Sequence, residues 1–222
     1  PRVPMAELER LLRSKAVLLP GVKMILDCEQ ASGGPLSKTW SYPGGLAQYL
    51  TELAGYQQPV APLFAAEKFA ADGDENYAPG EGASWVLGWF GDPVPSESYV
   101  NLIPTVAGGT HESGLRSGVF EAVRSFIEHH GLLPRGVKLV QEDVCSRLAF
   151  VLSARILDPQ FQGQVKEKLN SREAVKLVAS QLRDPLEIWL NNHLEAGKAI
   201  ADVSIRQALA RQKNAQKVEK RK

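Results

Sequence analysis

The sequence predicts an α+β fold: a mixed β-sheet packed by helices on one face, followed by a long C-terminal helical extension. Helical and strand periodicities alternate along the chain, as such a fold requires. Residues 148–157 are apolar on both faces and therefore predict a strand at the centre of the sheet. No proline follows Pro185, so the last part of the chain is able to form a continuous helix.

The N-terminal part is predicted to form a helix, a β-hairpin and a second helix. Apolar residues recur at helical spacing in residues 6–19, and Pro20-Gly21 ends this helix. Two short runs, 22–28 and 37–42, enclose the turn residues Ser32-Gly33-Gly34-Pro35 and predict the hairpin. A brief helix follows, and its apolar face comprises Leu46, Tyr49, Leu50 and Leu53.

The middle of the chain is predicted to supply most of the sheet. A largely irregular stretch contains one short strand at 64–70, and two strands at 83–90 and 99–106 are then expected to pair antiparallel. A helix at 111–130 comes next, and Thr110 is placed to cap it. The apolar stripe of this helix comprises Leu115, Val119, Val123, Phe126 and Ile127. A short strand at 137–140 precedes the central strand.

The C-terminal part is predicted to be helical. Asp158-Pro159 ends the central strand and begins the loop 160–170, after which Ser171 opens a helix. Asp184-Pro185-Leu186-Glu187 predicts a new helix start, because Asp184 suits the cap and Pro185 the first turn. Running to the C-terminus, this helix would span roughly 50 Å. We therefore divide the chain into an α/β core, 1–183, and a helical extension, 184–222.

Composition excludes several classes of protein. The 222 residues are 44% hydrophobic and 23% charged, which is typical of a globular chain and excludes a disordered or fibrous one. No apolar run of 18 residues exists, and the N-terminus lacks the apolar core of a signal peptide. Cys28 and Cys145 lie far apart without metal-ligand spacing, which favours reduced thiols. We expect a cytoplasmic location.

Charge is distributed unevenly along the chain. The last 17 positions hold seven basic residues and one acidic residue, a net charge of +6, whereas the other 205 positions hold 19 basic and 24 acidic residues, a net charge of −5. The basic residues of this tail are Arg206, Arg211, Lys213, Lys217, Lys220, Arg221 and Lys222. Such polarity suits contact with nucleic acid or another acidic surface, and it equally suits a solvated helix end.

Standard catalytic signatures are missing from the sequence. It contains no GxxxxGK[ST] phosphate loop, GxGxxG, HExxH or GxSxG motif. His129 and His130 end the helix 111–130, where an imidazolium suits the helix dipole, and His193 is expected to be a core histidine. The residues alone therefore give little sign of an enzyme.

Two segments nevertheless stand out. In residues 99–116 a strand leads through Gly108-Gly109-Thr110-His111 into a helix, which predicts either a tight glycine turn or an anion site at the helix N-terminus. In residues 158–169 the loop carries Gln164, Val165 and Lys166. This loop is either solvated surface or a support for a lysine that reaches a phosphate held by another domain.

Together the two segments resemble the B subunits of bacterial type II DNA topoisomerases, in which a Gly-Gly-Thr-His turn and a Gln-Thr-Lys loop occur in this order in the transducer domain. Three further stretches resemble the topoisomerase IV type of B subunit more than the gyrase type. They are residues 133–139, 142–144 and 158–161, and the resemblance covers nearly the whole chain.

The resemblance implies roles for individual residues. Lys166 would be the catalytic residue, since it would contact the γ-phosphate of ATP bound to a preceding ATPase domain of the Bergerat type. Gln164 would assist in nucleotide binding beside Lys166, whereas Val165 stands where the family usually has threonine. ATP would be the cofactor, and Mg²⁺ would serve the complete enzyme without being bound by this fragment. The resemblance also implies a left-handed βαβ crossover, and a metal-binding cleavage domain after this segment.

The function implied is that of a transducer that senses ATP through Lys166 and couples its binding and hydrolysis to DNA strand passage, as part of an isomerase. The excised fragment alone would be inactive. Partners implied are the transported DNA segment, the A subunit of topoisomerase IV and a second copy of the B subunit, without any membrane. Two alternatives stay open: a gyrase B transducer, and a stand-alone nucleic-acid or partner-binding module without catalysis.

Overall fold

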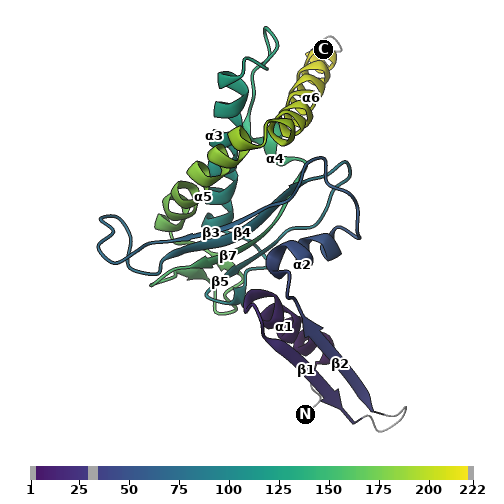
Figure 1. The fold of residues 1–222 in the computed structure, drawn as a ribbon, viewed down its shortest axis with the longest axis vertical. Coiled ribbons are helices and arrows are strands. Elements are labelled where there is room, and N and C mark those ends of the chain that lie inside the picture. The colour runs from purple at the N-terminus through teal and green to yellow at the C-terminus, as the bar shows by residue number, and fades with distance from the viewer. Residues whose placement is uncertain (1–3, 30–34, 220–222) are drawn as a thin grey trace.

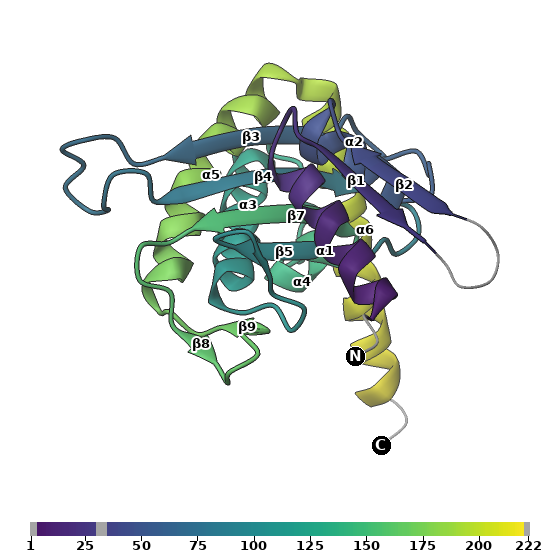
Figure 2. The ribbon, with the colours of Figure 1, turned by 90° about the horizontal axis from the view of Figure 1, so that it is seen from below.

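A five-stranded mixed sheet with the strand order β3-β4-β7-β5-β6 lies at the centre of the molecule (Figure 2). The computed structural model describes residues 4–29 and 35–219. The strands are β3 (Phe64–Phe69), β4 (Gly82–Trp89), β5 (Glu97–Val100), β6 (Ile103–Pro104) and β7 (Leu148–Arg155). β7 is antiparallel to β4 and parallel to β5, which makes the sheet mixed. The predicted α+β class and the central position of β7 are confirmed.

Helices cover both faces of this sheet, so the expectation of helices on one face was wrong (Figure 1). α3 (Thr110–His129) and α5 (Glu173–Asn192) pack on one face, where Phe150 and Leu152 of β7 lie in a common core with them. α1 (Met5–Leu18) and α2 (Gly45–Leu53) adjoin the other face, where Ala149 and Val151 are buried. A strand that is apolar on both faces has to be covered on both.

The N-terminal elements form as predicted. β1 (Lys23–Cys28) and β2 (Leu36–Ser41) pair antiparallel as a separate two-stranded sheet between α1 and α2 along the chain. Of the predicted turn, Ser32, Gly33 and Gly34 lie outside the described residues. Lys38 of β2 donates a 2.7 Å hydrogen bond to Glu9 of α1, which ties the hairpin to that helix.

The predicted pairing of 83–90 with 99–106 was wrong, because β7 lies between β4 and β5. The segment 99–106 is also no single strand. Asn101 and Leu102 adopt φ values of 49° and 66°, which reverse the chain between β5 and β6. The Asn101 side chain stabilises this turn, since its amide donates to Ile156 O at 2.7 Å and its oxygen accepts from Ile156 N at 3.0 Å.

The connection from β5 to β7 is a parallel crossover through α3 and a short helix, α4 (Gln141–Cys145). Residues 137–140, predicted as a strand, are irregular and lead into α4. Val140 N donates to Asp143 Oδ2 at 2.8 Å, so this stretch serves as the entry to a helix rather than as part of the sheet. The handedness of the crossover stays a prediction.

The predicted helix start at Asp184 was wrong, because both Asp184 and Pro185 lie inside α5. Leu182 and Leu186 on either side are fully buried against the same core, so packing along α3 carries the helix through the proline. The chain bends instead at His193, which is exposed rather than a core residue, and α6 (Leu194–Glu219) follows. The boundary at 183 and 184 thus falls inside a helix, and the division into core and extension stays a prediction.

α6 leaves the core as the long extension expected at the C-terminal end, whereas α1 and the β1–β2 hairpin lie at the opposite end of the molecule (Figure 1). Arg211 holds α6 to α4 through a bidentate ion pair, in which Nε and Nη2 each lie 2.9 Å from an Asp143 carboxylate oxygen. None of the helices in the described residues is sufficiently long and apolar to span a bilayer.

Candidate functional site

The structure brings together the two segments that the sequence singled out. The loop after β7 is a small hairpin of β8 (Phe161–Gln162) and β9 (Lys168–Leu169), seen at the lower left of Figure 2. Leu169 N donates to Gly108 O at 3.1 Å, and Ala107 N donates to Glu167 O at 3.0 Å. The glycine turn before α3 therefore anchors one arm of the hairpin.

The tip of this hairpin presents a lysine to the outside. Gln164, Val165 and Lys166 are all exposed, and Gly163 and Lys166 both have a positive φ, 75° and 55°. The Lys166 ammonium lies 5.8 Å from the centre of the Phe161 ring, within range of a cation–π contact. Within residues 4–29 and 35–219 no carboxylate forms an ion pair with Lys166. The cation is available to an external anion.

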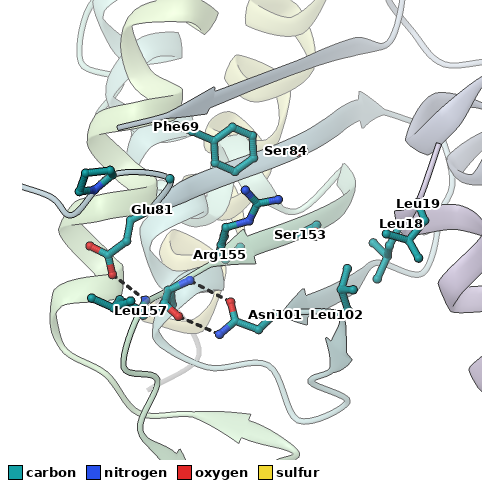
Figure 3. Close-up of a pocket in the computed structure, with 14 residues that line it drawn as sticks. Leu18, Leu19, Phe69, Glu81, Ser84, Asn101, Leu102, Ser153, Arg155 and Leu157 are labelled. Carbon is teal, nitrogen blue, oxygen red and sulfur yellow. Dashed lines mark hydrogen bonds between the residues drawn. The ribbon is translucent and has the colours of Figure 1, made fainter. Parts of the chain in front are cut away.

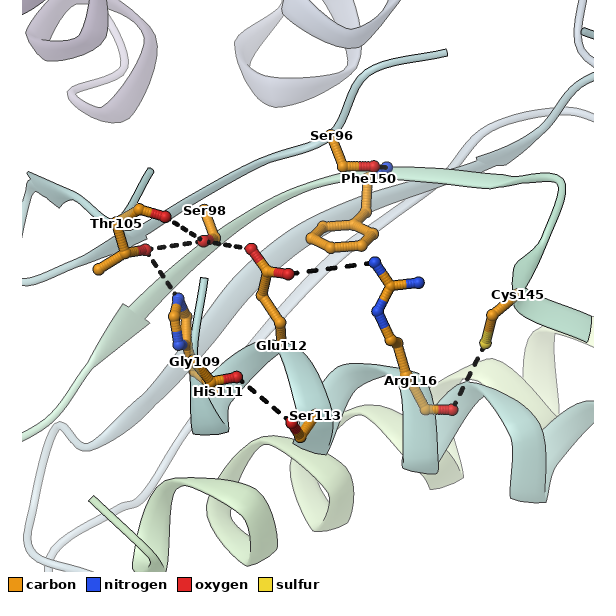
Figure 4. A network of polar contacts seen from close by, with 10 residues as sticks. All are labelled: Ser96, Ser98, Thr105, Gly109, His111, Glu112, Ser113, Arg116, Cys145 and Phe150. Atoms are coloured by element: carbon orange, nitrogen blue, oxygen red, sulfur yellow. Dashed lines mark hydrogen bonds and ion pairs between the residues drawn. The ribbon is translucent and has the colours of Figure 1, made fainter. Parts of the chain in front are cut away.

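A row of buried polar side chains lies beneath the glycine turn (Figure 4). His111 is fully buried, and its Nε2 lies 2.9 Å from Thr105 Oγ1. Thr105 Oγ1 lies 2.7 Å from Ser98 Oγ, which donates to Glu112 Oε1 at 2.7 Å. Burial lowers the pKa of His111 to about 4, so the ring is neutral near pH 7. The row ties β5, the turn and the first turn of α3 together.

The glycine segment itself is a tight turn, as one of the two interpretations predicted. Gly109 has a φ of 140°, and a Cβ there would lie 2.3 Å from Leu169 O. Thr110 was wrongly expected to cap α3, because the N-cap is Gly109. Among the residues that the structure describes, no side chain caps the helix, and the buried Thr110 Oγ1 has no hydrogen-bond partner. Leu169 of β9 lies so close to Gly109 that the N-cap position has no room for a side chain.

A groove of about 490 Å³ between the end of α1 and the sheet is a second candidate site, which the sequence did not indicate (Figure 3). Arg155 lies 4.9 Å over the Phe69 ring there, and Glu81 accepts a hydrogen bond from Leu157 N at 2.8 Å. These residues come from separate elements, so no local motif could have revealed them. Across the described part of the chain, no three His, Cys, Asp or Glu side chains gather as a metal site would require.

The basic C-terminal tail is partly paired with acids of this chain. Arg206 lies 2.9 Å from Asp202, and Arg211 is bound to Asp143, whereas Lys213 and Lys217 are exposed. Lys220, Arg221 and Lys222 lie outside the described residues. Tail cations that remain exposed suit a weak electrostatic contact with a polyanion.

The fold matches part of the solved ATP-binding regions of type II topoisomerases, over about half of each. The structure resembles the ATP binding domain of Francisella tularensis topoisomerase IV with a TM-score of 0.74 and 31% identity, over 95% of this chain and 54% of that one. It shares the fold of the 43K ATPase domain of Thermus thermophilus gyrase B with a TM-score of 0.77 and 23% identity, over 99% of this chain and 57% of that one.

The sequence profile of the DNA gyrase B family matches residues 45–220, and the chain belongs to this family. It is 42% identical to the B subunit of DNA topoisomerase 4 from Pseudomonas aeruginosa, over 98% of its length and 33% of that protein. It is 39% identical to the corresponding protein of Escherichia coli over 100% of its length and 34% of that protein. The chain thus spans about a third of these relatives, and the resemblance to B subunits is confirmed at the level of the family.

Proposed function

We propose that this chain is the transducer segment of a topoisomerase IV B subunit, and that Lys166 presents its ammonium to the γ-phosphate of ATP held by another domain. The observation that carries the proposal is an exposed lysine, without an ion-pair partner among the described residues, at the tip of a hairpin whose base is bonded to the turn before α3. An ammonium donates strong, charge-assisted hydrogen bonds to phosphate oxygens.

The packing of α3 supports a coupling role. α3 begins at the glycine turn that holds the hairpin and then runs along α5 in the core. Near its other end, the Phe126 ring packs where α6 passes at Gly197. A displacement of the hairpin by a contact at Lys166 would therefore be transmitted along α3 to α6. A phosphate contact can move a distant element in this way.

The exposed residues at the hairpin tip are suited to form one part of a nucleotide site. Lys166 supplies one cation and Gln164 one amide, both exposed, and the Val165 side chain offers no hydrogen bond. ATP, when bound, would supply the anion that Lys166 neutralises. The rest of the nucleotide pocket, and any Mg²⁺ with it, would then belong to a preceding domain.

The activity of the complete subunit would be ATP-dependent DNA strand passage in the cytoplasm, with the A subunit of topoisomerase IV and a second copy of the B subunit as partners. The exposed lysines of α6 would face the transported DNA segment. A gyrase B subunit is the second candidate, favoured by the family profile. A topoisomerase IV would decatenate and relax DNA, whereas a gyrase would supercoil it. Decatenation assays of the complete enzyme, set against supercoiling assays, decide between them.

Replacing Lys166 by alanine in the complete subunit tests the proposal. Losing one charge-assisted hydrogen bond costs about 1.5 to 3 kcal/mol, so ATP turnover should fall about ten- to a hundred-fold. ADP affinity should stay unchanged, because ADP lacks the contacted phosphate. Lys168→Ala is the matched control, since Lys168 is an exposed lysine two positions away in β9. Wild-type turnover of Lys166→Ala would contradict the proposal.

A further inference from the structure

We propose that Gly109 and Leu169 form a positioning contact that holds Lys166 at the distance and orientation its phosphate contact needs. This inference rests on the function proposed above and adds two positioning residues to it. Neither residue would touch the nucleotide, and both would act through the placement of the hairpin tip.

The contact is made by backbone on both sides. Gly109 and Leu169 form a parallel β-bridge, and Leu169 N donates to Gly108 O at 3.1 Å. A second bond joins Ala107 N to Glu167 O at 3.0 Å, directly beside Lys166. The residue that follows Lys166 is thus bonded to the turn, while Gly163, Gln164 and Val165 on the other side are exposed.

Each partner of the contact is fixed in the core. The Leu169 side chain is 0% exposed and lies in the same core as α3 and α5. On the other side, the turn is followed by His111, also 0% exposed and bonded to Thr105. Two rigid anchors therefore define where the loop between them can lie.

Position 109 has no room for a side chain. A Cβ would lie 2.3 Å from Leu169 O and 2.6 Å from Leu169 N, and the φ of 140° is unfavourable for any residue except glycine. Because the clashing atoms are backbone, β9 or the start of α3 would have to shift. Either shift changes the position of the hairpin relative to the turn before α3, and so the placement of Lys166, without changing its charge. A displacement of about 1 Å at a reacting group can cost about a hundred-fold in rate.

A double-mutant cycle in the complete subunit tests this contact with four proteins: wild type, Gly109→Ala, Lys166→Ala and the double variant. We expect Gly109→Ala to lower kcat for ATP about tenfold or more and to leave ADP affinity unchanged. In the Lys166→Ala background the same change should have no further effect on kcat, because it acts through the lysine.

Gly82→Ala is the matched control. Gly82 has a φ of 155° and its Cβ would lie 2.1 Å from Lys68 O, so it strains a backbone contact of the same kind between β3 and β4, away from α3 and the hairpin. It should retain kcat under conditions in which the variant is folded. If Gly109→Ala does not fold, Leu169→Ala enters the same cycle, because it loosens the contact from the side of the hairpin.

The outcomes separate the two ideas. Wild-type turnover of Lys166→Ala would refute the proposed function itself. Reduced turnover of Lys166→Ala, combined with normal turnover of the anchor variant or with losses that add in the double variant, would refute the positioning contact and leave the role of Lys166 intact.

Discussion

The buried His111 should make the stability of this protein depend on pH. Ser98 donates to the Glu112 carboxylate, so Thr105 has to donate to Ser98 and His111 Nε2–H to Thr105. This direction of hydrogen bonds fixes the neutral tautomer with its proton on Nε2. His111 Nδ1 is buried and has no hydrogen-bond partner in the described part of the chain, so a second proton there would be an unpaired buried donor.

The magnitude follows from the two pKa values of His111. Burial lowers the pKa from 6.5 in the unfolded chain to about 4 in the folded protein. Between these values the unfolded state binds a proton that the folded state does not, so the free energy of unfolding falls as the pH is lowered from about 6.5 to about 4. At 1.36 kcal/mol for each pKa unit, His111 contributes a loss of about 3 kcal/mol across this window.

Urea denaturation at a series of pH values measures this loss, with His111→Gln as the test variant. Its amide is able to replace the bond to Thr105 but does not titrate, so its stability should decline less than that of wild type below pH 6.5. His193→Gln, which removes an exposed histidine, should keep the wild-type slope. An identical slope in His111→Gln, or an NMR titration of His111 with a pKa near 6.5, would refute the reasoning.

Three further predictions concern the isolated chain. It should hydrolyse no ATP above a buffer blank, because in the proposed function it would contribute only Lys166 and Gln164 to a nucleotide site held by another domain, and hydrolysis that disappears in Lys166→Ala would contradict this. Truncation after Ile205 should weaken DNA binding and flatten its salt dependence, as fluorescence anisotropy at several salt concentrations would show; an unchanged slope would mean that the tail does not bind. Gly197→Ala should lower the free energy of unfolding by about 1 to 3 kcal/mol in denaturant, since its Cβ would lie 2.5 Å from the Phe126 ring; unaltered stability would show that the ring can move aside.

Elements with a strong local pattern could be predicted from the sequence. The buried stripe of α3 and the doubly apolar β7 follow from hydrophobic periodicity alone, and both are confirmed. Strand pairing could not be predicted, because the insertion of β7 between β4 and β5 depends on segments far apart in the chain. The turn at Asn101-Leu102 uses positive φ without glycine, and Leu102 gives no local signal of it, whereas Asn101 gives only a weak one. Pro185 led to a wrong prediction of a helix start, because the packing of α5 in the core outweighs the preference of proline for a first turn.

The candidate site could be predicted in its parts but not in its assembly. Lys166 was singled out through resemblance, and Gly108-Gly109 through its turn character. The turn and the hairpin meet through the backbone contact of Gly109 with Leu169, about 60 positions apart. Side-chain identity gives no signal of such a contact. Ser98 of β5 and Thr105, which follows β6, complete the polar row beneath the turn, and neither is distinctive in the sequence before the fold buries them with His111.

The position of β7 in the sheet has a consequence for synthesis of the chain. β3 and β4 are able to pair as soon as both have left the ribosome. The other edge of β4 stays unpaired until β7 has been synthesised. Roughly 60 residues separate the two strands, and at about 5 to 20 residues per second they take about 3 to 12 seconds to make. Throughout that interval β4 presents an unpaired edge and a row of apolar side chains, including Trp85 and Trp89. The nascent chain would be most prone to aggregation, and most in need of a chaperone, during these seconds.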